Sequence, residues 1–98
     1  MRTMIQVEFD TETMNRLISD GSLPGIMESV LGTLKPEAAS FHPYAGSRAA
    51  TIVVDVADPA AIVAVCEPFR LRMNAEVTLT PCMNAEDLTT GPSRIDRT

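Results

Sequence analysis

Apolar and polar residues alternate in four short segments of the chain. Alternation with a period of two is the pattern of a strand that buries one face. In the first segment, residues 3–9, the apolar side chains of Ile5, Val7 and Phe9 share one face. The other segments are residues 39–44, 47–56 and 74–80. The pattern therefore predicts four strands, each with one face directed toward a core.

The region between the first two strands repeats apolar residues at intervals of three and four, which is typical of helices with one buried stripe. Asp10 stands at its start, where a carboxylate can accept hydrogen bonds from the first free N–H groups of a helix. Asp20-Gly21 interrupts the repeat, and Pro24 fits the first turn of a second helix. We therefore predict two helices joined near residues 21–23.

A second helical repeat lies between the last two strands and consists of Ile62, Cys66, Phe69 and Met73. Asp58 and Pro59 precede it as a predicted N-cap and first-turn proline. Pro68 lies inside the repeat, where a proline removes a backbone hydrogen bond and clashes with the preceding turn. We therefore expect this helix to kink or stop near Glu67.

The segment SFHPYAGSRAATIVVDV, residues 40–56, has the features of a β-hairpin. Ala45-Gly46 is a suitable two-residue turn, because glycine adopts a positive φ without steric cost. The register that follows from this turn pairs Tyr44 with Ser47, His42 with Ala49 and Ser40 with Thr51. Pro43 cannot donate a hydrogen bond, so its strand is predicted to lie at an edge of the sheet.

The elements follow one another in the order β-α-β-β-α-β, which makes the chain an α+β protein of the ferredoxin-like sandwich type. Right-handed crossovers place the first and third strands in the centre of a four-stranded antiparallel sheet. Both helical regions cover the face of Ile5, so the opposite, mostly polar face stays uncovered and favours dimerisation. We assign residues 1–90 to this single domain, with a capped helical turn at residues 84–88, and residues 91–98 to a flexible tail.

The charge of the chain excludes several kinds of partner. Its 98 residues carry a formal net charge of −5, and its eight basic residues are scattered, which argues against nucleic acid and anionic membranes. No apolar run is long enough to span a bilayer, and Gln6 and Glu8 follow the N-terminus too early for a secretory signal. Cys66 and Cys82 make neither a disulfide framework nor a metal-ligand spacing. We therefore expect a cytoplasmic protein with no metal site and no cofactor.

A family resemblance rests on runs that extend over nearly the whole chain, namely Lys35-Pro36-Glu37-Ala38-Ala39, Gly46-Ser47-Arg48, Asp58-Pro59, Glu67-Pro68 and Thr80-Pro81 to Asp87-Leu88. Through them the chain resembles a family of small, uncharacterised bacterial proteins of the dimeric α+β barrel superfamily. In that superfamily two ferredoxin-like subunits close their sheets into one barrel, so the resemblance implies a homodimer. The superfamily includes cofactor-independent monooxygenases, muconolactone-type isomerases, haem-degrading enzymes, polyketide cyclases and proteins without known activity. Fold similarity does not choose among these activities.

The candidate catalytic residues are His42, Tyr44 and Glu8. His42 is the only histidine, and histidine is the side chain that most readily gains or loses a proton near neutral pH. Tyr44 lies two residues on and shares its face, about 6–7 Å away along the strand. The structural alternative is that His42 and Tyr44 close the open end of a barrel or line the rim of a dimer interface.

The candidate ligand-binding residues are Thr51, Asp55, Glu76 and Arg48. Arg48 is expected to face the helix side next to the turn, where it could reach an anionic ligand or solvent. Glu8, Asp55 and Glu76 form a set of carboxylates on the uncovered face, and neighbouring carboxylates can shift one another's pKa. The alternative is that they are solvated, or paired with Arg2, Arg48 or an arginine of a partner subunit.

We therefore expect a cytoplasmic homodimer that binds an uncharged or weakly acidic small organic molecule, in the barrel or in the cleft between sheet and helices. Any catalysis would be cofactor-independent acid-base chemistry, such as isomerisation, cyclisation or oxygenation, with His42 transferring the proton. Tyr44 and Glu8 would then orient or polarise the ligand. The alternative is a non-catalytic dimerisation or regulatory module, and whether the protein is an enzyme stays open.

Overall fold

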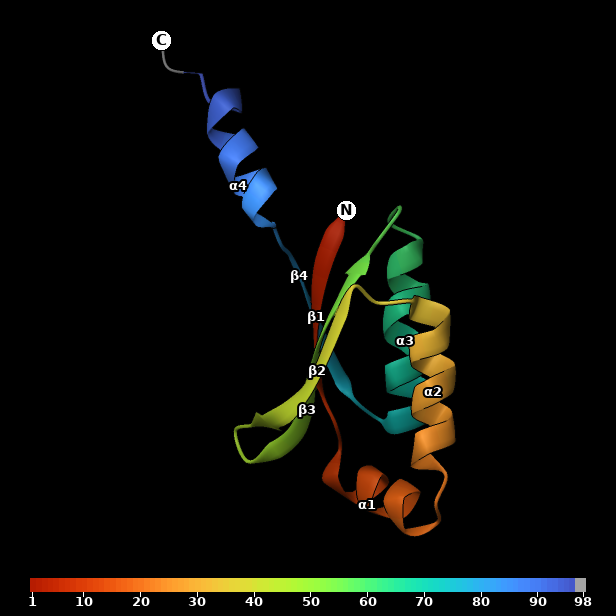
Figure 1. Ribbon diagram of the computed structural model, residues 1–98. Helices are drawn as coiled ribbons and strands as arrows, with labels where there is room; N and C mark the ends of the chain where they lie inside the picture. The colour runs from red at the N-terminus through yellow and green to blue at the C-terminus, as the bar shows by residue number, and fades with distance from the viewer. Residues whose placement is uncertain (97–98) are drawn as a thin grey trace.

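The computed structural model describes residues 1–96, which form an α+β protein built on one four-stranded sheet (Figure 1). The strands are β1 (Arg2–Glu8), β2 (Ala38–Tyr44), β3 (Ser47–Asp55) and β4 (Glu76–Pro81). The helices are α1 (Thr11–Ser19), α2 (Leu23–Leu34), α3 (Ala61–Met73) and α4 (Ala85–Thr90), followed by a 3-10 helix at Gly91–Arg94. All four predicted strands are therefore present, with helical segments between them as expected.

The sheet has the strand order β2-β3-β1-β4, and each neighbouring pair is antiparallel. β1 and β3 are thus central and β2 and β4 are the edges, as the crossover rule predicted. Pro43 lies in edge strand β2, where its missing N–H is tolerated. The arrangement of strands and helices is compatible with the ferredoxin-like sandwich that the element order predicted.

The β2–β3 hairpin has the predicted register, which pairs Tyr44 with Ser47, His42 with Ala49 and Ser40 with Thr51. Its two turn residues, Ala45 and Gly46, have φ angles of 50° and 81°. Positive φ at both positions is the geometry of a type I′ turn, whose twist matches that of the flanking strands. The turn therefore sets which hairpin side chains share a face.

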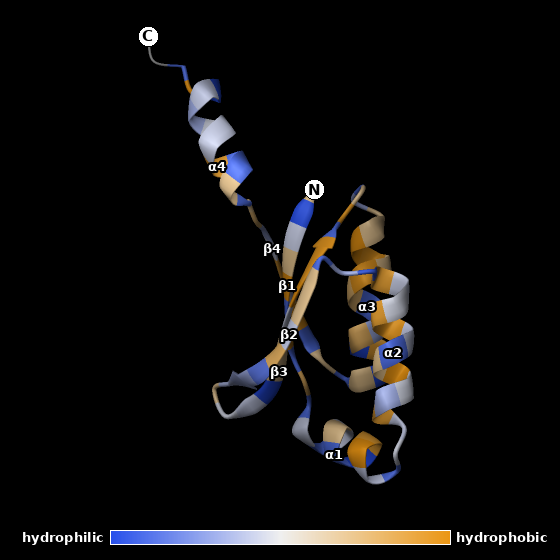
Figure 2. Cartoon of the chain, in the orientation of Figure 1, coloured by the Kyte–Doolittle hydropathy of each residue, from blue (hydrophilic) through white to orange (hydrophobic). Residues whose placement is uncertain are grey.

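α2 and α3 lie side by side on one face of the sheet (Figure 1). Both helices are rich in apolar residues, orange in Figure 2, and the buried ones pack in one cluster with Ile5, Val7 and Ile52, which are completely buried in the sheet. Phe69 and Met73 of α3 are likewise 0% exposed. Burial of one such side chain stabilises the fold by roughly 1.5–3 kcal/mol, so this layer is the core of the protein. Within residues 1–96 no helix covers the opposite face of the sheet.

The first helical region consists of two helices, as predicted. The carboxylate of Asp10 caps α1, because it accepts the hydroxyl of Thr13 at 2.7 Å and the backbone N–H of Thr13 at 2.9 Å. These two hydrogen bonds, the one from the hydroxyl first, hold the pKa of Asp10 below its usual value. Gly21, with a φ of 78°, lies in the joint between α1 and α2.

α3 begins later than the sequence suggested. Its N-cap is Ala60 and its first residue Ala61, so Pro59 does not occupy the first turn as expected. The carboxylate of Asp58 nevertheless accepts the backbone N–H of Ala61 at 2.9 Å. Asp58 therefore lies in the turn before α3 and still accepts a hydrogen bond from a backbone N–H at the start of the helix.

Of the two outcomes predicted near Glu67, a kink or a stop, the stop is wrong, because α3 continues through Pro68 to Met73. A proline in a helix interior costs about 3 kcal/mol relative to alanine. Cys66 and Phe69, on either side of Pro68, are 1% and 0% exposed. Burial of the side chains on both sides of the proline offsets the lost hydrogen bond, so tertiary packing keeps the segment helical.

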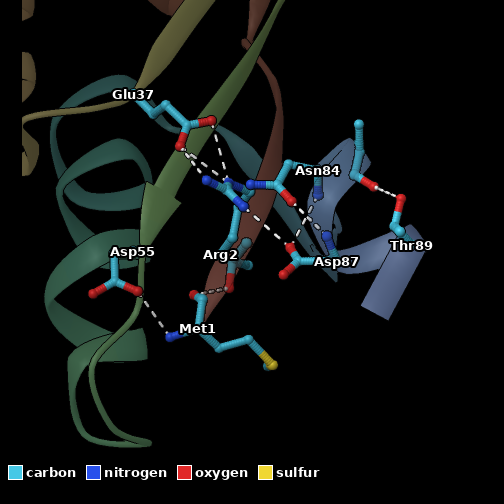
Figure 3. A network of polar contacts seen from close by, with 9 residues as sticks. Met1, Arg2, Glu37, Asp55, Asn84, Asp87 and Thr89 are labelled. Atoms are coloured by element: carbon cyan, nitrogen blue, oxygen red, sulfur yellow. Dashed lines mark hydrogen bonds and ion pairs between the residues drawn. The ribbon is translucent and has the colours of Figure 1, made fainter. Parts of the chain in front are cut away.

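α4 projects away from the sheet and from α1–α3 (Figure 1), and the molecule is 61 Å long. The predicted capped turn at residues 84–88 is confirmed, since Asn84 and Asp87 each bond the other's backbone N–H, at 2.8 and 3.1 Å. An ion pair of 3.2 Å between Asp87 and Arg2 links α4 to β1 (Figure 3). Residues 97 and 98 of the predicted tail lie outside the described residues.

Candidate functional site

The uncovered face of the sheet holds the candidate residues in cross-strand rows. One row crosses the sheet in the order His42, Ala49, Glu8 and Glu76, from β2 through β3 and β1 to β4. The next row consists of Ser40, Thr51, Gln6 and Thr78. Side chains that are opposite one another in such rows have Cβ atoms about 4.5–5.5 Å apart. The register therefore gathers polar residues of all four strands in two neighbouring rows.

Two hydrogen bonds hold the ring of His42. Its Nδ1 lies 3.0 Å from the backbone carbonyl oxygen of Pro43, and its Nε2 lies 2.8 Å from Oγ1 of Thr51. A carbonyl oxygen can only accept, so Nδ1 carries a proton. In the neutral ring Nε2 is then the acceptor, and the Thr51 hydroxyl donates to it. The contact with Pro43 thus selects the tautomer whose Nε2 lone pair points along the sheet face.

A hollow of about 120 Å³ lies beside His42. It is lined by Gln6, Val7, Glu8, His42, Tyr44, Ala49, Ala50, Thr51 and Thr78. Ala49 stands between His42 and Glu8 in their row, and its small side chain leaves the space open. All three candidate catalytic residues and one candidate binding residue, Thr51, therefore meet at this hollow.

Glu8 and Glu76 are directly opposite each other on β1 and β4. Like charges in this position repel and destabilise the strand pair. Among residues 1–96 neither carboxylate forms an ion pair. Glu8 lines the hollow, whereas Glu76 lies next to it at the end of the sheet. The hollow is therefore acidic on the side away from His42.

The structure places Asp55 and Arg48 away from the hollow. Asp55, at the other end of the sheet, pairs with the N-terminal ammonium of Met1 at 2.9 Å. Arg48 faces the helix side, as expected, and donates to Oδ1 of Asn15 at 3.0 Å. Both contacts are exposed to solvent. These two candidates therefore do not share a site with His42.

Arg2 is one of the partners predicted for the carboxylates Glu8, Asp55 and Glu76, but it binds two other carboxylates. Its guanidinium donates to the carboxylate of Glu37, at 2.8 Å for the shortest contact, and to that of Asp87 at 3.2 Å (Figure 3). The hydrogen bond to Glu37 raises the pKa of Arg2 above its ordinary value. The sequence does not reveal this cluster, because its members come from β1, the segment before β2, and α4.

Gln6, Thr78 and Ala49 line the hollow but were not among the predicted site residues. Gln6 and Thr78 carry polar groups on the predicted uncovered face, and this placement was the available signal. Ala49 contributes by being small, which composition and pattern do not distinguish from an ordinary strand residue. The volume of a hollow depends on neighbours from other strands, so it becomes visible only in the folded chain.

The two cysteines differ in their surroundings. Cys66 is buried in the core, as predicted, and burial raises the pKa of its thiol. Cys82 is half-buried after the end of β4. In the described part of the chain, no three His, Cys, Asp or Glu side chains form a group that could hold a metal ion. Nor does any helix there have the length and apolar character needed to cross a membrane.

Comparison with known proteins gives no family for this chain: no protein-family model and no curated protein matches it. The resemblance to the dimeric α+β barrel superfamily therefore stays a prediction.

Proposed function

We propose that the chain is a ferredoxin-like protein that forms a homodimer of the dimeric α+β barrel type and binds a small, uncharged or weakly acidic organic molecule beside His42. The observation that carries this proposal is the meeting of His42, Tyr44, Glu8 and Thr51 around one hollow on the uncovered face. These residues come from three different strands. A site assembled from several strands and lined by both polar and aromatic groups is typical of small-molecule binding.

The proposed chemistry is proton transfer without a cofactor. Nε2 of His42 takes a proton from the bound molecule and can return it at another position, which is the step required for an isomerisation or a cyclisation. A well-placed general base accelerates such a step by about 10²–10⁴-fold. Tyr44 and Glu8, at the same hollow, would orient or polarise the ligand.

Homodimer formation is supported by the neutral centre of the uncovered face. Two adjacent cross-strand rows there contain no charged side chain, namely Ala38, Val53, Met4 and Thr80, and Ser40, Thr51, Gln6 and Thr78. In a chain with 21% charged residues, such a patch resembles the centre of a protein–protein interface, which is depleted of charge. A second copy of the chain, packed sheet against sheet, would also cover the hollow.

Native mass spectrometry of the protein as purified from cells tests both parts of this proposal. We expect a dimer with a constant additional mass, which is reduced or lost in His42→Ala. Met4→Lys places a charge in the neutral centre and should yield monomers. Leu71→Lys, at an 80% exposed position on α3, adds the same charge on the helix side and should leave the dimer intact. A wild-type monomer would contradict the barrel proposal.

The second candidate function is a non-catalytic dimerisation or regulatory module. The size of the hollow favours it, because about 120 Å³ is less than the roughly 300–1,000 Å³ of most ligand pockets. This function predicts an empty dimer and a His42→Ala variant that matches the wild type in assembly and in its partners. A bound molecule that is displaced by this substitution would argue against the module.

A further inference from the structure

The hydrogen bonds of His42 indicate which kind of ligand the hollow can accept. Nδ1 donates its hydrogen to the Pro43 carbonyl, so the group of the ring that a ligand can bind is the lone pair of Nε2. That lone pair lies in the plane of the ring and accepts one strong hydrogen bond. The Thr51 hydroxyl now provides it at 2.8 Å. A ligand that binds His42 must therefore replace this hydroxyl with a donor of its own.

We propose that the ligand of the hollow is a neutral hydroxyl compound of about one six-membered ring, which donates its O–H group to Nε2 of His42 in place of the Thr51 hydroxyl. This inference rests on the proposed function and specifies the ligand class of the same site. The exchange of one hydroxyl donor for another preserves every hydrogen bond of His42.

The size of the hollow sets the size of this ligand. Its volume is about 120 Å³, and an apolar cavity of about 150 Å³ accommodates a benzene molecule. The hollow is smaller than that cavity but is partly open to solvent, so a single ring can enter it with one edge outside, whereas a nucleotide or a polycyclic cofactor is too large for the hollow of one protomer. Tyr44, which is 56% exposed, presents an aromatic ring at the hollow. Offset stacking between aromatic rings then favours a phenol over a saturated alcohol.

The charges around the hollow favour a neutral ligand over an anion. Glu8 lines it and Glu76 is directly opposite Glu8, while none of the lysines and arginines within residues 1–96 belongs to the lining. A carboxylate or phosphate placed there would meet the like charge of Glu8, with that of Glu76 next to the hollow. Gln6 and Thr78 add neutral donors and acceptors across from His42, which suit a ligand that carries a second oxygen.

Titration with four ring compounds, followed by amide NMR shifts of the residues that line the hollow, tests this inference. The probes are phenol, anisole, cyclohexanol and benzoate, measured at pH 8, above the range in which histidine ordinarily gains a proton. Phenol should bind about two- to tenfold more tightly than anisole, the ratio expected for one neutral hydrogen bond. Cyclohexanol should bind more weakly than phenol but still better than benzoate.

Two matched substitutions test the exchange itself. Thr51→Val removes the competing hydroxyl and keeps the β-branched shape that suits a strand, so phenol should bind about two- to tenfold more tightly than to the wild type. Thr51→Ser keeps the hydroxyl and should bind phenol as the wild type does. If Thr51→Val instead weakens phenol binding, the hydroxyl belongs to the binding site and the proposed exchange is wrong.

The results separate this inference from the proposed function. Equal binding of phenol and anisole, or tightest binding of benzoate, would overturn the hydroxyl assignment and still leave a ligand site beside His42. Benzylamine serves as a cationic probe, and a preference for it over phenol would assign the hollow to amines instead. If none of the probes shifts the amides around the hollow, small-molecule binding itself fails.

Discussion

Pro68 offers a direct test of how tertiary packing overrides local preference. In the structure it lies inside α3, with helix continuing to Met73. Pro68→Ala restores the N–H that can bond the carbonyl one turn earlier and removes the clash of the ring with that turn. We expect the variant to be more stable than the wild type.

The magnitude follows from three contributions. A proline in a helix interior costs about 3 kcal/mol relative to alanine. Loss of proline makes the unfolded chain more flexible, which offsets about 0.4–1 kcal/mol of the gain. The half-buried ring loses packing worth roughly 0.5–1 kcal/mol, as each fully buried methylene contributes about 0.8 kcal/mol. The net increase is about 1–2 kcal/mol, which for a domain of this size raises Tm by about 4–16 °C.

Urea denaturation followed by circular dichroism measures this change. Wild type and variant must be compared at one protein concentration, because dimer formation would make the midpoint concentration-dependent. The m-value should stay constant while the midpoint rises. Pro59→Ala is the matched control, since Pro59 is exposed and lies outside α3, and this variant should gain no stability. A Pro68→Ala midpoint at or below that of the wild type would refute the idea that packing holds α3 helical against the cost of its proline.

Three further measurements test the caps, the hairpin and the core. Because the folded-state pKa of Asp10 is lowered, its carboxylate contributes stability above the usual aspartate pKa of about 3.9, and this contribution is lost as the pH falls through the lowered value. Asp10→Asn can still cap α1, so its urea midpoint should depend less on pH between pH 2 and pH 7 than that of the wild type. Asp10→Ala should have a lower midpoint than the wild type at pH 7. Equal curves for the wild type and both variants would contradict this role of Asp10. Ala45→Asn should raise stability by about 0.5–1 kcal/mol in thermal unfolding, since asparagine tolerates the positive φ better than alanine does, whereas Gly46→Ala should lower it. A thiol reagent should label Cys82 in the native protein and Cys66 only after denaturation. Rapid labelling of both cysteines in the native protein would show that the core around Cys66 opens more readily than its packing implies.

Part of the candidate site could be predicted because its residues belong to one hairpin. The turn at Ala45-Gly46 determines the pairing of His42 with Ala49, and alternation then places Thr51 on the same face. The participation of Glu8 was also expected, because β1 was predicted to lie next to β3. Strand periodicity and turn chemistry are local properties, so they can be inferred without the folded structure.

Other parts of the site could not be predicted. The hydrogen bond between His42 and Thr51 depends on the rotamers of both side chains, and the alternation pattern contains no information on rotamers. Asp55 has the residue type and the face that a ligand site requires, yet its position at the far end of β3 gives it the N-terminal ammonium as its partner. Two residues on the same face of the sheet therefore need not belong to the same site.

By itself, the sequence determined the four strands, their alternating faces, the hairpin register and the joint between α1 and α2. These features follow from interactions between residues that are close in the chain. Only the tertiary structure decided that α3 continues through Pro68, that Arg2 joins Glu37 and Asp87, and that a hollow remains beside His42. Each of these depends on groups from separate elements, whose burial and mutual distances arise only when the sheet and its helices pack together.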